Sequence, residues 1–427
     1  MSAKMESPDS QHAETTISGF SSPEATKVLI IGAGPTGLAL GQGLKQAGIS
    51  CIIVEKDESI NARTRDWNMG MVWGKAALKS LIVDEMWDRL QYAQVDPSQP
   101  PPESDSMNFV NGKSGEVMIS IPVQRLYRLR RSKLRELLAE GLDVRYGMSF
   151  DKIDLSSDTG NVTVRFEDGS SITAKQVVGS NGARSSVRQF LLGPERGAVR
   201  RLPYSATFIH SKYTREQALY LRKFHTAYIA AIHPDGYFSF FGMQDAADPD
   251  RPETWTFFIY ISWYSSLEEQ DATAHCSDAQ RLAQVKEFSR IFTEPFRSAL
   301  EWASADCPVW YMCMHYFDPG VEGHRWDNHG GRITLAGDAA HAMTYQRGQG
   351  LNHSLTDAAR LCEAIKKFTA NECTQEEAIS SFEEEMIARA GGEARMSVSN
   401  TEMLHDWQRV MQSYLAKKGL DPHKGGS

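Results

Sequence analysis

The chain has 427 residues, of which 41% are hydrophobic and 23% are charged, and its formal net charge is −8. This is the composition of a globular protein with room for two packed domains. The acidic balance argues against a nucleic-acid-binding protein, which normally carries a basic surface. The six cysteines form no CxxC pair or His/Cys cluster, so we expect no disulfide framework and no bound metal.

The N-terminal segment, residues 1–26, is rich in Ser, Thr and Glu and lacks the apolar core of a signal peptide. We expect it to be a disordered tail. No later run approaches the roughly 18 consecutive apolar residues of a membrane-spanning helix. We therefore expect a cytoplasmic protein without a membrane partner.

The ordered part begins at Lys27 with "KVLIIGAGPTGLALGQGLKQAGISCIIVEKD", whose pattern predicts a strand, a glycine turn, a helix and a second strand. In the turn, Gly32 permits the tight bend, Gly34 lets the backbone approach a pyrophosphate, and Gly37 lets helix and strand pack closely. Glu55 ends the second strand, where its carboxylate can accept hydrogen bonds from an adenosine ribose. The unit predicts an ADP-containing cofactor and leaves NAD and FAD as alternatives.

Arginines and a proline-rich run follow this unit. Arg63 and Arg65 come soon after the second strand and either cover the dinucleotide phosphates or are solvated; we take Arg63 as a candidate cofactor-binding residue. Residues Gln91 to Ser106 carry several prolines in a polar run, which predicts an exposed loop without regular structure. The run "RLRRSKLRELLAEGL" predicts a helix with Arg131 near its start, a further candidate site residue.

The middle of the chain is predicted to be mostly β-sheet. Residues 144–173 alternate like paired strands around a hairpin turn at 167–170, and "VVGSNGARSSVR" adds a buried strand and a glycine turn. From Leu202 to about Tyr264, aromatic-rich strands predict a sheet whose face either walls an apolar pocket or belongs to a plain hydrophobic core. A helical stretch over 277–302 and a strand over 309–315 follow.

A further glycine-rich region, "RITLAGDAAHAMTYQRGQGLNHSLTDAARLCEAIKKF", returns to the pattern of the first. A strand leads into a glycine-acid turn, and a second turn opens a long amphipathic helix. The amides and the positive dipole end at this helix start suit a ring that becomes anionic when reduced, and a flavin is such a ring. Two glycine-rich loops at opposite ends of the chain indicate a ligand long enough to contact both.

Taken in order, the GxGxxG turn, "VVGSNGARSSVR" and "LAGDAAHAMTYQRGQGLNHSLTDA" resemble the FAD-dependent aromatic hydroxylase type of flavoprotein monooxygenase, the group A enzymes that include p-hydroxybenzoate and salicylate hydroxylases. The resemblance runs from about Lys27 to Leu415. It implies an α/β fold with a Rossmann-like FAD-binding domain, an inserted β-sheet substrate domain and C-terminal helices. The expected ranges are 27–105, 125–200 and 330–370 for the FAD-binding domain, 106–124 and 201–329 for the substrate domain, and 371–427 for the C-terminal helices.

The resemblance also implies which residues hold FAD. It assigns the ADP half to Gly32, Gly34, Gly37 and Glu55, the ribityl and phosphate region to Asp338, and the isoalloxazine to Gly348, Gln349, Gly350, Leu351 and Asn352. It places Arg131 near FAD and associates Asn181, Gly182 and Arg188 with both FAD and NADPH.

Two positions depart from the family pattern. Asn181 stands where the family has Asp, which keeps a donor and an acceptor but removes the charge and puts the NADPH contact in question. Tyr345 stands where the family has Pro, and its ring either points into the substrate pocket and selects the substrate or lies against Met343 or the protein surface. We expect His341 to be structural rather than a base, and no catalytic side chain is predicted.

The implied activity is that of a monooxygenase that uses NADPH or NADH and non-covalent FAD. Reduced flavin reacts with dioxygen to give a flavin hydroperoxide, whose distal oxygen passes to an aromatic, polyketide-like or terpenoid-like small molecule, while the protein supplies orientation and a dry site. A flavin oxidase or dehydrogenase on the same scaffold is the main alternative, and a non-enzymatic FAD-binding module is another. Hydroxylation, epoxidation and Baeyer–Villiger insertion are not distinguished by the sequence, and neither is the oligomeric state.

Overall fold

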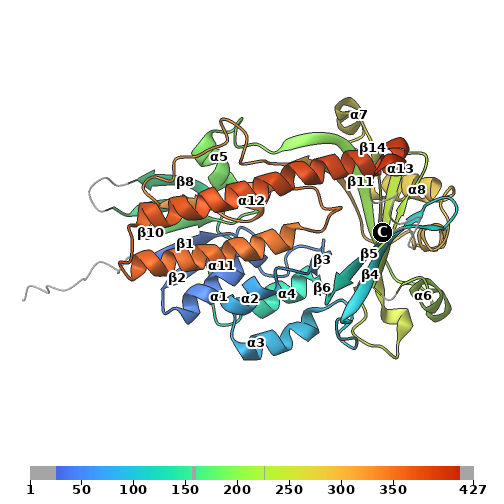
Figure 1. Cartoon of the computed structure of the whole chain (residues 1–427), viewed down its shortest axis with the longest axis horizontal. Helices are drawn as coiled ribbons and strands as arrows, with labels where there is room; N and C mark the ends of the chain where they lie inside the picture. Colours follow the sequence, from blue (N-terminus) through green and yellow to red (C-terminus); the bar gives the residue numbers. More distant parts are fainter. Residues whose placement is uncertain (1–25, 156–159, 226, 414–427) are drawn as a thin grey trace, which may run out of the picture.

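The structure is a computed structural model that describes residues 26–155, 160–225 and 227–413 (Figure 1). Residues 1–25 of the expected tail and residues 414–427 of the expected C-terminal helices lie outside this described part. Thr26, the last residue of the expected tail, begins the first strand instead.

A seven-stranded sheet organises the first half of the molecule. Its strands, in spatial order, are β7 (Val144–Arg145), β2 (Cys51–Val54), β1 (Thr26–Ile31), β10 (Ser171–Gly179), β9 (Val162–Phe166) and β8 (Phe150–Leu155), and β16 (Ile333–Leu335) pairs with β10. The pairs among β7, β2, β1, β10 and β16 are parallel, whereas β9 and β8 add an antiparallel edge. Residues 28–31 are all buried, as expected for a central parallel strand.

Helices pack against this sheet and against one another. The helix α1 (Pro35–Gln46) contacts α11 (Gly350–Thr369), α4 (Arg131–Ala139) and α2 (Lys75–Leu81). The long helix α12 (Gln375–Leu404) lies beside α11 and runs from the first sheet to the second (Figure 1). Shorter helices are α3 (Asp84–Asp88), α5 (Ser186–Leu192), α10 (Asp338–His341), α13 (Trp407–Gln412) and the 3-10 turns Arg89–Ala93 and Pro252–Thr254. Within the described ranges, no helix combines the length and the apolarity needed to cross a bilayer.

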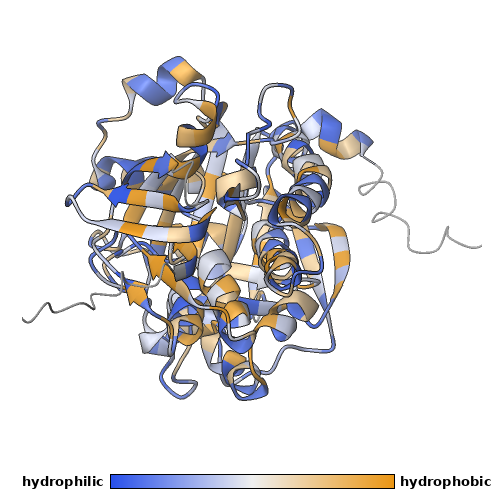
Figure 2. Cartoon of the chain, turned by 90° about the vertical axis from the view of Figure 1, so that its left-hand side faces the viewer, coloured by the Kyte–Doolittle hydropathy of each residue, from blue (hydrophilic) through white to orange (hydrophobic). Residues whose placement is uncertain are grey.

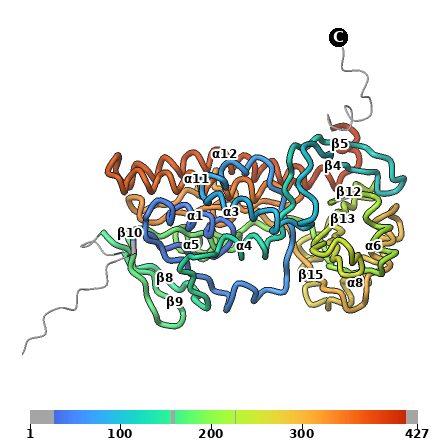
Figure 3. Tube along the Cα trace, turned by 90° about the horizontal axis from the view of Figure 1, so that it is seen from below, coloured from blue at the N-terminus to red at the C-terminus, as the bar shows by residue number. Residues whose placement is uncertain are grey.

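A second seven-stranded sheet lies at the other end of the molecule. Its spatial order is β15 (Val309–Tyr316), β11 (Arg200–Ser211), β14 (Thr256–Tyr264), β13 (Tyr237–Asp245), β12 (Tyr228–Ile232), β4 (Ser104–Asn111) and β5 (Val117–Gln124). All neighbours are antiparallel except β12 and β4. Figure 3 shows β4 and β5, from an early part of the chain, beside the later strand β12. Two separate segments of the chain therefore build this sheet.

Each face of the second sheet is covered by its own apolar cluster. On one face the helices α8 (Asp278–Ser289) and α9 (Phe296–Glu301) pack on the strands, and α6 (Arg215–Arg222) and α7 (Leu267–Ala272) lie at the rim. On the other face, aromatic residues of the sheet contact the C-terminal end of α12 through Leu404. Figure 2 shows hydrophobic residues gathered on the strands and inner helix faces, with hydrophilic residues at the periphery. We call the second face, which carries Phe208, Tyr260 and Trp310, the inner face.

A small two-stranded sheet joins the two halves. It pairs β3 (Asn68–Met71) with β6 (Tyr127–Arg130) in antiparallel register. The amide of Asn68 donates to the Met243 carbonyl oxygen at 3.2 Å and to Oε1 of Gln244 at 2.9 Å, both on β13. The strand β3 also contacts α11, so this small sheet connects the helices of the first half of the molecule with the second seven-stranded sheet.

Two of the expected elements differ in the structure. We expect the run Gln91 to Ser106 to be an exposed loop, but Val95 within it is buried. Its N–H donates to the carbonyl oxygen of Arg128, and its carbonyl oxygen accepts from the N–H of Ala246. The end of the 3-10 turn Arg89–Ala93 and the first three residues of β4 also fall inside this run. The expected helix over 277–302 is two helices, α8 and α9, separated by residues 290–295. Pro295, which precedes α9, has no N–H with which to continue an earlier helix.

Candidate cofactor and substrate site

The first glycine turn, after β1, is shaped by close backbone contacts. Gly32 has φ +115°, and a side chain there would lie 2.6 Å from the Ser180 carbonyl oxygen. A side chain at Gly37 would lie 2.2 Å from the carbonyl oxygen of Gly32. At Gly34 the nearest atom is 4.0 Å from the position of a Cβ, so that side of the turn is open. Two glycines therefore close the turn, and the third leaves room for a ligand's phosphates.

Glu55 and Arg135 hold this turn from two sides. The Glu55 carboxylate is buried and accepts hydrogen bonds from the backbone N–H groups of Ala33 at 2.9 Å and Asp57 at 3.2 Å. Arg135 donates from Nε to the Ala33 carbonyl at 2.8 Å and from Nη1 to the Ile60 carbonyl at 2.9 Å. The sequence analysis missed Arg135, although its place among the leucines on the buried face of α4 distinguishes it from a solvated arginine.

The two arginines expected near the cofactor have different surroundings. Arg63 lies at the surface and pairs with Asp57 through contacts of 2.5 and 3.0 Å, so its charge is already matched within the protein. Arg131 places its guanidinium 4.8 Å from the ring centroid of Trp67 and forms no ion pair within the described ranges. Burial lowers the pKa of Arg131 to about 10, and repulsion from Arg135 and Arg63 adds to this. Arg131 is therefore a charged group without an acidic partner, close to the residues that hold the glycine turn.

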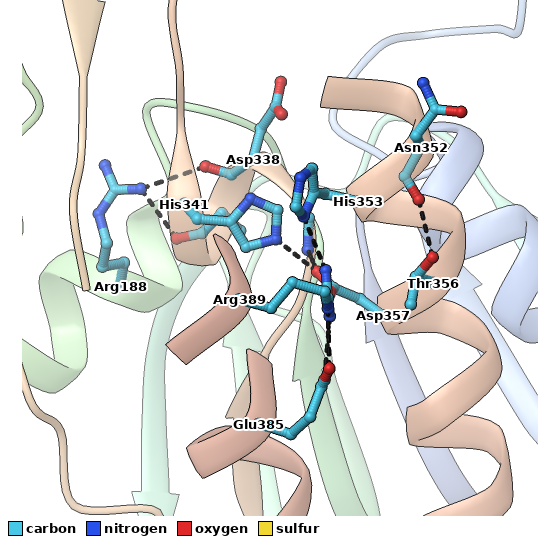
Figure 4. Close-up of polar contacts among 11 residues, drawn as sticks. Arg188, Asp338, His341, Asn352, His353, Thr356, Asp357, Glu385 and Arg389 are labelled. Atoms are coloured by element: carbon cyan, nitrogen blue, oxygen red, sulfur yellow. Dashed lines mark hydrogen bonds and ion pairs between the residues drawn. The ribbon is translucent and has the colours of Figure 1, made fainter. Parts of the chain in front are cut away.

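Asp338 is the first residue of α10, and its side chain is exposed to solvent. Desolvation by the surrounding protein raises the pKa of its carboxyl group against the attraction of His341, His315 and Arg131. Figure 4 shows the carboxylate pointing away from the polar network beside it. It is therefore free to accept hydrogen bonds from the hydroxyl groups of a ligand.

A buried polar network behind Asp338 ties α10, α11 and α12 together (Figure 4). Asp357 of α11 accepts hydrogen bonds from the N–H of Gly337 at 2.7 Å, from Nε2 of His341 at 2.5 Å and from Nη2 of Arg389 at 2.7 Å. Arg389 of α12 also donates to Nδ1 of His353 at 2.8 Å. The network thus fixes the glycine-acid turn to the helix that follows it, and His341 is fully buried within it.

The ionisation states in this network follow from its contacts. Burial opposes ionisation of Asp357, but the charges and hydrogen bonds of His341 and Arg389 outweigh it and hold the pKa of Asp357 below its usual value. Burial, together with His341 and Arg389, lowers the pKa of His353 to about 4. His353 is therefore neutral near pH 7, and its ring nitrogen can accept the Arg389 hydrogen bond.

The middle motif supports the same turn from the opposite side. Arg188 of α5 is fully buried and donates to the carbonyl oxygens of Gly197 at 2.8 Å, Ala339 at 2.8 Å and Ala183. Its guanidinium also lies 4.2 Å from the ring centroid of Phe317. The implied contact of Arg188 with NADPH is wrong for this geometry, because protein atoms enclose the guanidinium on every side. Arg188 instead positions the backbone of α10.

Asn181 uses both ends of its amide within the turn before α5. Its Oδ1 accepts from the Ser185 hydroxyl at 2.5 Å, and its Nδ2 donates to the Ser186 hydroxyl at 2.9 Å. Gly182 has φ +84° and open space around its Cβ position. The asparagine therefore maintains the hydrogen bonds of the turn without placing a negative charge there.

The start of α11 presents a second ligand-binding surface. This helix has 20 residues, and its N-cap residue, Gln349, makes no capping hydrogen bond to it. The N–H groups of the first turn, at Gly350, Leu351 and Asn352, have no acceptor within the helix. With the helix dipole they form a site that favours negative charge. A ligand ring that becomes negatively charged when it is reduced would be stabilised at this site.

The Asn352 side chain joins the start of α11 to the loop after β3. Its Oδ1 accepts from the N–H groups of Val72 at 2.9 Å and Gly74 at 3.0 Å, and its Nδ2 donates to the Gly70 carbonyl at 3.2 Å. The next loop residue, Trp73, donates from Nε1 to Gln349 at 2.8 Å. The Asn352 amide is thus used within the protein, and only its backbone N–H is left for a ligand.

Tyr345 lies between the glycine-acid turn and α11 and packs on the inner face of the second sheet. Its ring centroid is 5.4 Å from that of Phe208 and 5.3 Å from that of Tyr260, both in edge-on contact. Its hydroxyl group is buried and has no hydrogen-bond partner in the described part of the chain. The alternative in which the ring lies on the protein surface therefore does not occur. The second sheet reaches the cofactor turn at this residue.

Comparison with known proteins assigns the chain to a family. Residues 25–67 and 323–395 match the model of an FAD binding domain. The FAD-dependent monooxygenase cctM of Talaromyces islandicus is 37% identical over 400 residues, which cover 93% of this chain and 97% of that protein. The FAD-dependent monooxygenase phnB of Penicillium herquei is 35% identical over 410 residues, covering 95% and 97%. The chain belongs to the FAD-dependent monooxygenases.

The fold agrees with this assignment. The structure of HpxO from Klebsiella pneumoniae, complexed with FAD and uric acid, superposes with a TM-score of 0.70 at 19% identity and covers 92% of this chain and 93% of that one. The predicted α/β class and the predicted aromatic hydroxylase type are confirmed. The protein is thus an FAD-binding enzyme, and the open turn at Gly34, the exposed Asp338 carboxylate and the free amides at Gly350 fit that cofactor.

Proposed function

We propose that the enzyme uses NADPH or NADH and dioxygen to insert one oxygen atom into an aromatic, polyketide-like or terpenoid-like small molecule. When bound, FAD supplies the redox chemistry, because it accepts electrons from the nicotinamide cofactor and passes them to dioxygen. The observation that best supports this reaction is the contact of Tyr345 with Phe208 and Tyr260, which joins the cofactor turn directly to an aromatic surface.

In this proposal the residues at the ends of the cofactor have distinct tasks. The first glycine turn and Glu55 hold the ADP half, and Asp338 orients the ribityl chain. The amides at the start of α11 face the ring, and Arg131 lies beside the cofactor as a charge without an acidic partner. Arg63 is the weakest of the proposed ligands, because Asp57 already matches its charge. The ligands of the proposal are Gly32, Gly34, Gly37, Glu55, Arg63, Arg131, Asp338, Gly348, Gly350, Leu351 and Asn352.

The inner face of the second sheet supplies a dry surface for a planar substrate. Phe208 and Trp310 stack with centroids 5.5 Å apart and planes at 2°, and Phe240 and Tyr260 stack at 5.8 Å and 13°. Such a surface excludes water and holds flat molecules through ring contacts. The chain therefore contributes orientation and desolvation, and the proposed reaction needs no nucleophilic side chain.

Oxygen consumption separates this proposal from the oxidase or dehydrogenase alternative. With NADPH, the FAD-loaded enzyme should consume dioxygen faster when a panel of phenolic and polyketide-like compounds is added, and mass spectrometry should detect oxygenated products. A dehydrogenase would oxidise substrate without NADPH and without oxygen uptake. An oxidase would form hydrogen peroxide from substrate oxidation alone, and a binding module would show none of these activities.

We expect FAD to be bound without a covalent link. His341 of the cofactor turn and His353 of α11 are committed to the buried network, and Cys362 of α11 lies in the apolar core. The purified protein should be yellow, and acid precipitation should release the flavin into the supernatant. Flavin colour that stays with the washed pellet would contradict this expectation.

Replacing Tyr345 with phenylalanine tests the substrate side of the site. Its unpartnered hydroxyl is available to a substrate, so its loss should weaken substrate binding by about 2- to 10-fold, as expected for one neutral hydrogen bond. FAD affinity should not change, and more of the NADPH oxidised should end as hydrogen peroxide. Steady-state kinetics and a peroxide assay provide the measurement.

Tyr264→Phe is the matched control, because the Tyr264 side chain is 60% exposed and lies at the end of β14. It should leave both the substrate affinity and the peroxide yield unchanged. If Tyr345→Phe and Tyr345→Ala also leave both quantities unchanged, Tyr345 has no part in substrate binding.

A further inference from the structure

Arg128 is a half-buried arginine without an acidic partner among the described residues. It lies on β6, and its guanidinium carbon is 5.2 Å from the ring centroid of Tyr228 and 5.4 Å from that of Phe240. Its Nε is buried without a hydrogen bond, and none of the residues described in the structure forms an ion pair with it. Burial lowers the pKa of Arg128 to about 10, against the attraction of Tyr228 and Tyr260, so the group is charged near pH 7. A buried donor without a hydrogen-bond partner is costly unless a ligand meets it.

A row of aromatic rings leads from Arg128 to the cofactor turn. Tyr228 stacks on Phe240 with centroids 6.0 Å apart and planes at 7°, and Phe240 stacks on Tyr260 at 5.8 Å and 13°. Tyr260 in turn meets Tyr345 edge-on at 5.3 Å. We call Tyr228, Phe240, Tyr260 and Tyr345 the ring row. Arg128 lies at one end of it, and the residue next to the cofactor turn lies at the other.

Two hydroxyl groups of the ring row also lack partners. The hydroxyls of Tyr228 and Tyr345 are buried and form no hydrogen bond with any described residue. Asp105, the acid close enough to affect the pKa of Tyr228, is already paired with His225, whose Nε2 lies 3.4 Å from Oδ1 of Asp105. The unused polar groups thus lie at the two ends of an otherwise aromatic surface. This arrangement suits a flat ligand that carries oxygen substituents.

We propose that Arg128 anchors an ionised oxygen, that of a phenolate, on a planar aromatic substrate whose ring lies along the ring row with its far edge toward Tyr345. The inference rests on the proposed function and narrows the substrate class to aromatic compounds with an acidic hydroxyl group. A guanidinium suits this role, because it offers several donors in a rigid fork, is weakly hydrated and stacks on aromatic faces.

Equilibrium binding to the oxidised, FAD-loaded enzyme without NADPH tests the anchor. The probes are 4-nitrophenol, at a pH where it is largely ionised, and its methyl ether 4-nitroanisole, which cannot ionise. Arg128→Met should weaken the binding of 4-nitrophenolate by about 10- to 100-fold, as expected for loss of a charge-assisted hydrogen bond. The affinity for 4-nitroanisole should change by less than about threefold. Titration calorimetry measures both.

Arg125→Met is the matched control, because it removes the same charge from a nearby surface arginine whose partner is Glu103. It should leave the affinity for both probes unchanged. The visible spectrum gives a second readout, since the wild-type enzyme should convert 4-nitrophenol to its yellow ionised form at a pH where the free probe is mostly neutral. Arg128→Met should not do so.

Three results would overturn the anchor role. Arg128→Met could bind 4-nitrophenolate as tightly as the wild-type enzyme, or it could lose the same affinity for both probes. The wild-type enzyme could also fail to bind 4-nitrophenolate. If Arg128→Met does not retain FAD, Arg128→Lys takes its place, because lysine keeps the charge but not the fork. It should bind 4-nitrophenolate several-fold more weakly, and full affinity would overturn the proposal. These measurements involve no turnover, so a failure of the proposed reaction would show separately as the absence of NADPH-dependent oxygen consumption.

Discussion

Replacing Asp338 with alanine should weaken FAD binding by about 10- to 100-fold, which corresponds to about 1.5–3 kcal/mol for a charge-assisted hydrogen bond. The reason is the position of the carboxylate, which is exposed to solvent and points away from the buried network. Titration of the apoprotein with FAD, followed by the quenching of flavin fluorescence, measures the change. Full FAD occupancy after extensive dialysis would contradict the place given to the glycine-acid motif.

The same substitution should not destabilise the apoprotein. The folded state raises the pKa of Asp338, so its ionised form is disfavoured there relative to the unfolded chain. This penalty is absent below about pH 3.9 and grows as the pH rises from there toward the raised pKa of the folded state. Asp338→Ala should therefore raise the unfolding temperature of the apoprotein at neutral pH. Asp271→Ala, at an exposed aspartate paired with Arg201, should leave FAD affinity unchanged.

Asp357→Asn should have a large effect on stability, lowering the free energy of unfolding by about 3 kcal/mol, as expected when one partner of a buried ion pair is removed. The buried carboxylate accepts hydrogen bonds from Gly337, His341 and Arg389, and an amide cannot replace its charge. Because Gly337 belongs to the cofactor turn, FAD affinity should fall as well. Urea unfolding of the apoprotein measures the change in the free energy of unfolding.

The double variant Asp357→Asn/Arg389→Met provides the control for this pair. If the two groups act together, the double variant should lose much less stability than the sum of the single variants. Additive losses would show that the two side chains act independently, and a loss below about 1 kcal/mol for Asp357→Asn would show that the network adds little.

The network also predicts an acid dependence of stability. The folded state lowers the pKa of Asp357, so its contribution is present above the unfolded value of about 3.9 and is lost as the pH falls toward the lower folded value. The wild-type apoprotein should thus lose stability in this acidic window more steeply than Asp357→Asn. Thermal unfolding between about pH 2 and about pH 5 measures the two slopes, and equal slopes would contradict the assignment.

The parts of the fold that sequence reasoning predicted are those with local patterns. The strand, turn, helix and strand from Lys27 to Glu55 agree with β1, α1 and β2, and the amphipathic run after Gly348 agrees with α11. In each case a run of apolar residues with a fixed period and a glycine at its end defines the element. Long-range pairing has no such local pattern. The family resemblance assigned residues 106–124 to the substrate domain, but the sequence did not predict that β4 pairs with β12 in parallel.

The sequence also did not predict the side-chain partners that decide the role of each arginine. The sequence predicts cofactor contacts for Arg63, Arg131 and Arg188. In the structure, Arg63 pairs with Asp57, and Arg188 is buried and donates a hydrogen bond to the backbone of α10. The sequence did not distinguish Arg128 as a candidate site residue, because a basic residue in a short strand is usually solvated. Its environment comes from β12 and β13, a hundred residues further along the chain. The sequence also left two positions open for Tyr345, and the contacts with Phe208 and Tyr260 place its ring on the second sheet.

Isotope labelling tests the central claim, that the enzyme is a monooxygenase acting at the junction of the FAD site and the aromatic sheet. The FAD-loaded enzyme, NADPH and a panel of phenols are incubated under oxygen-18 gas, and the products are examined by mass spectrometry. The account predicts a product that carries one oxygen-18 atom, and this product should be strongly reduced in Asp338→Ala. A product that contains only oxygen from water, or an oxidised product without added oxygen, would contradict the account.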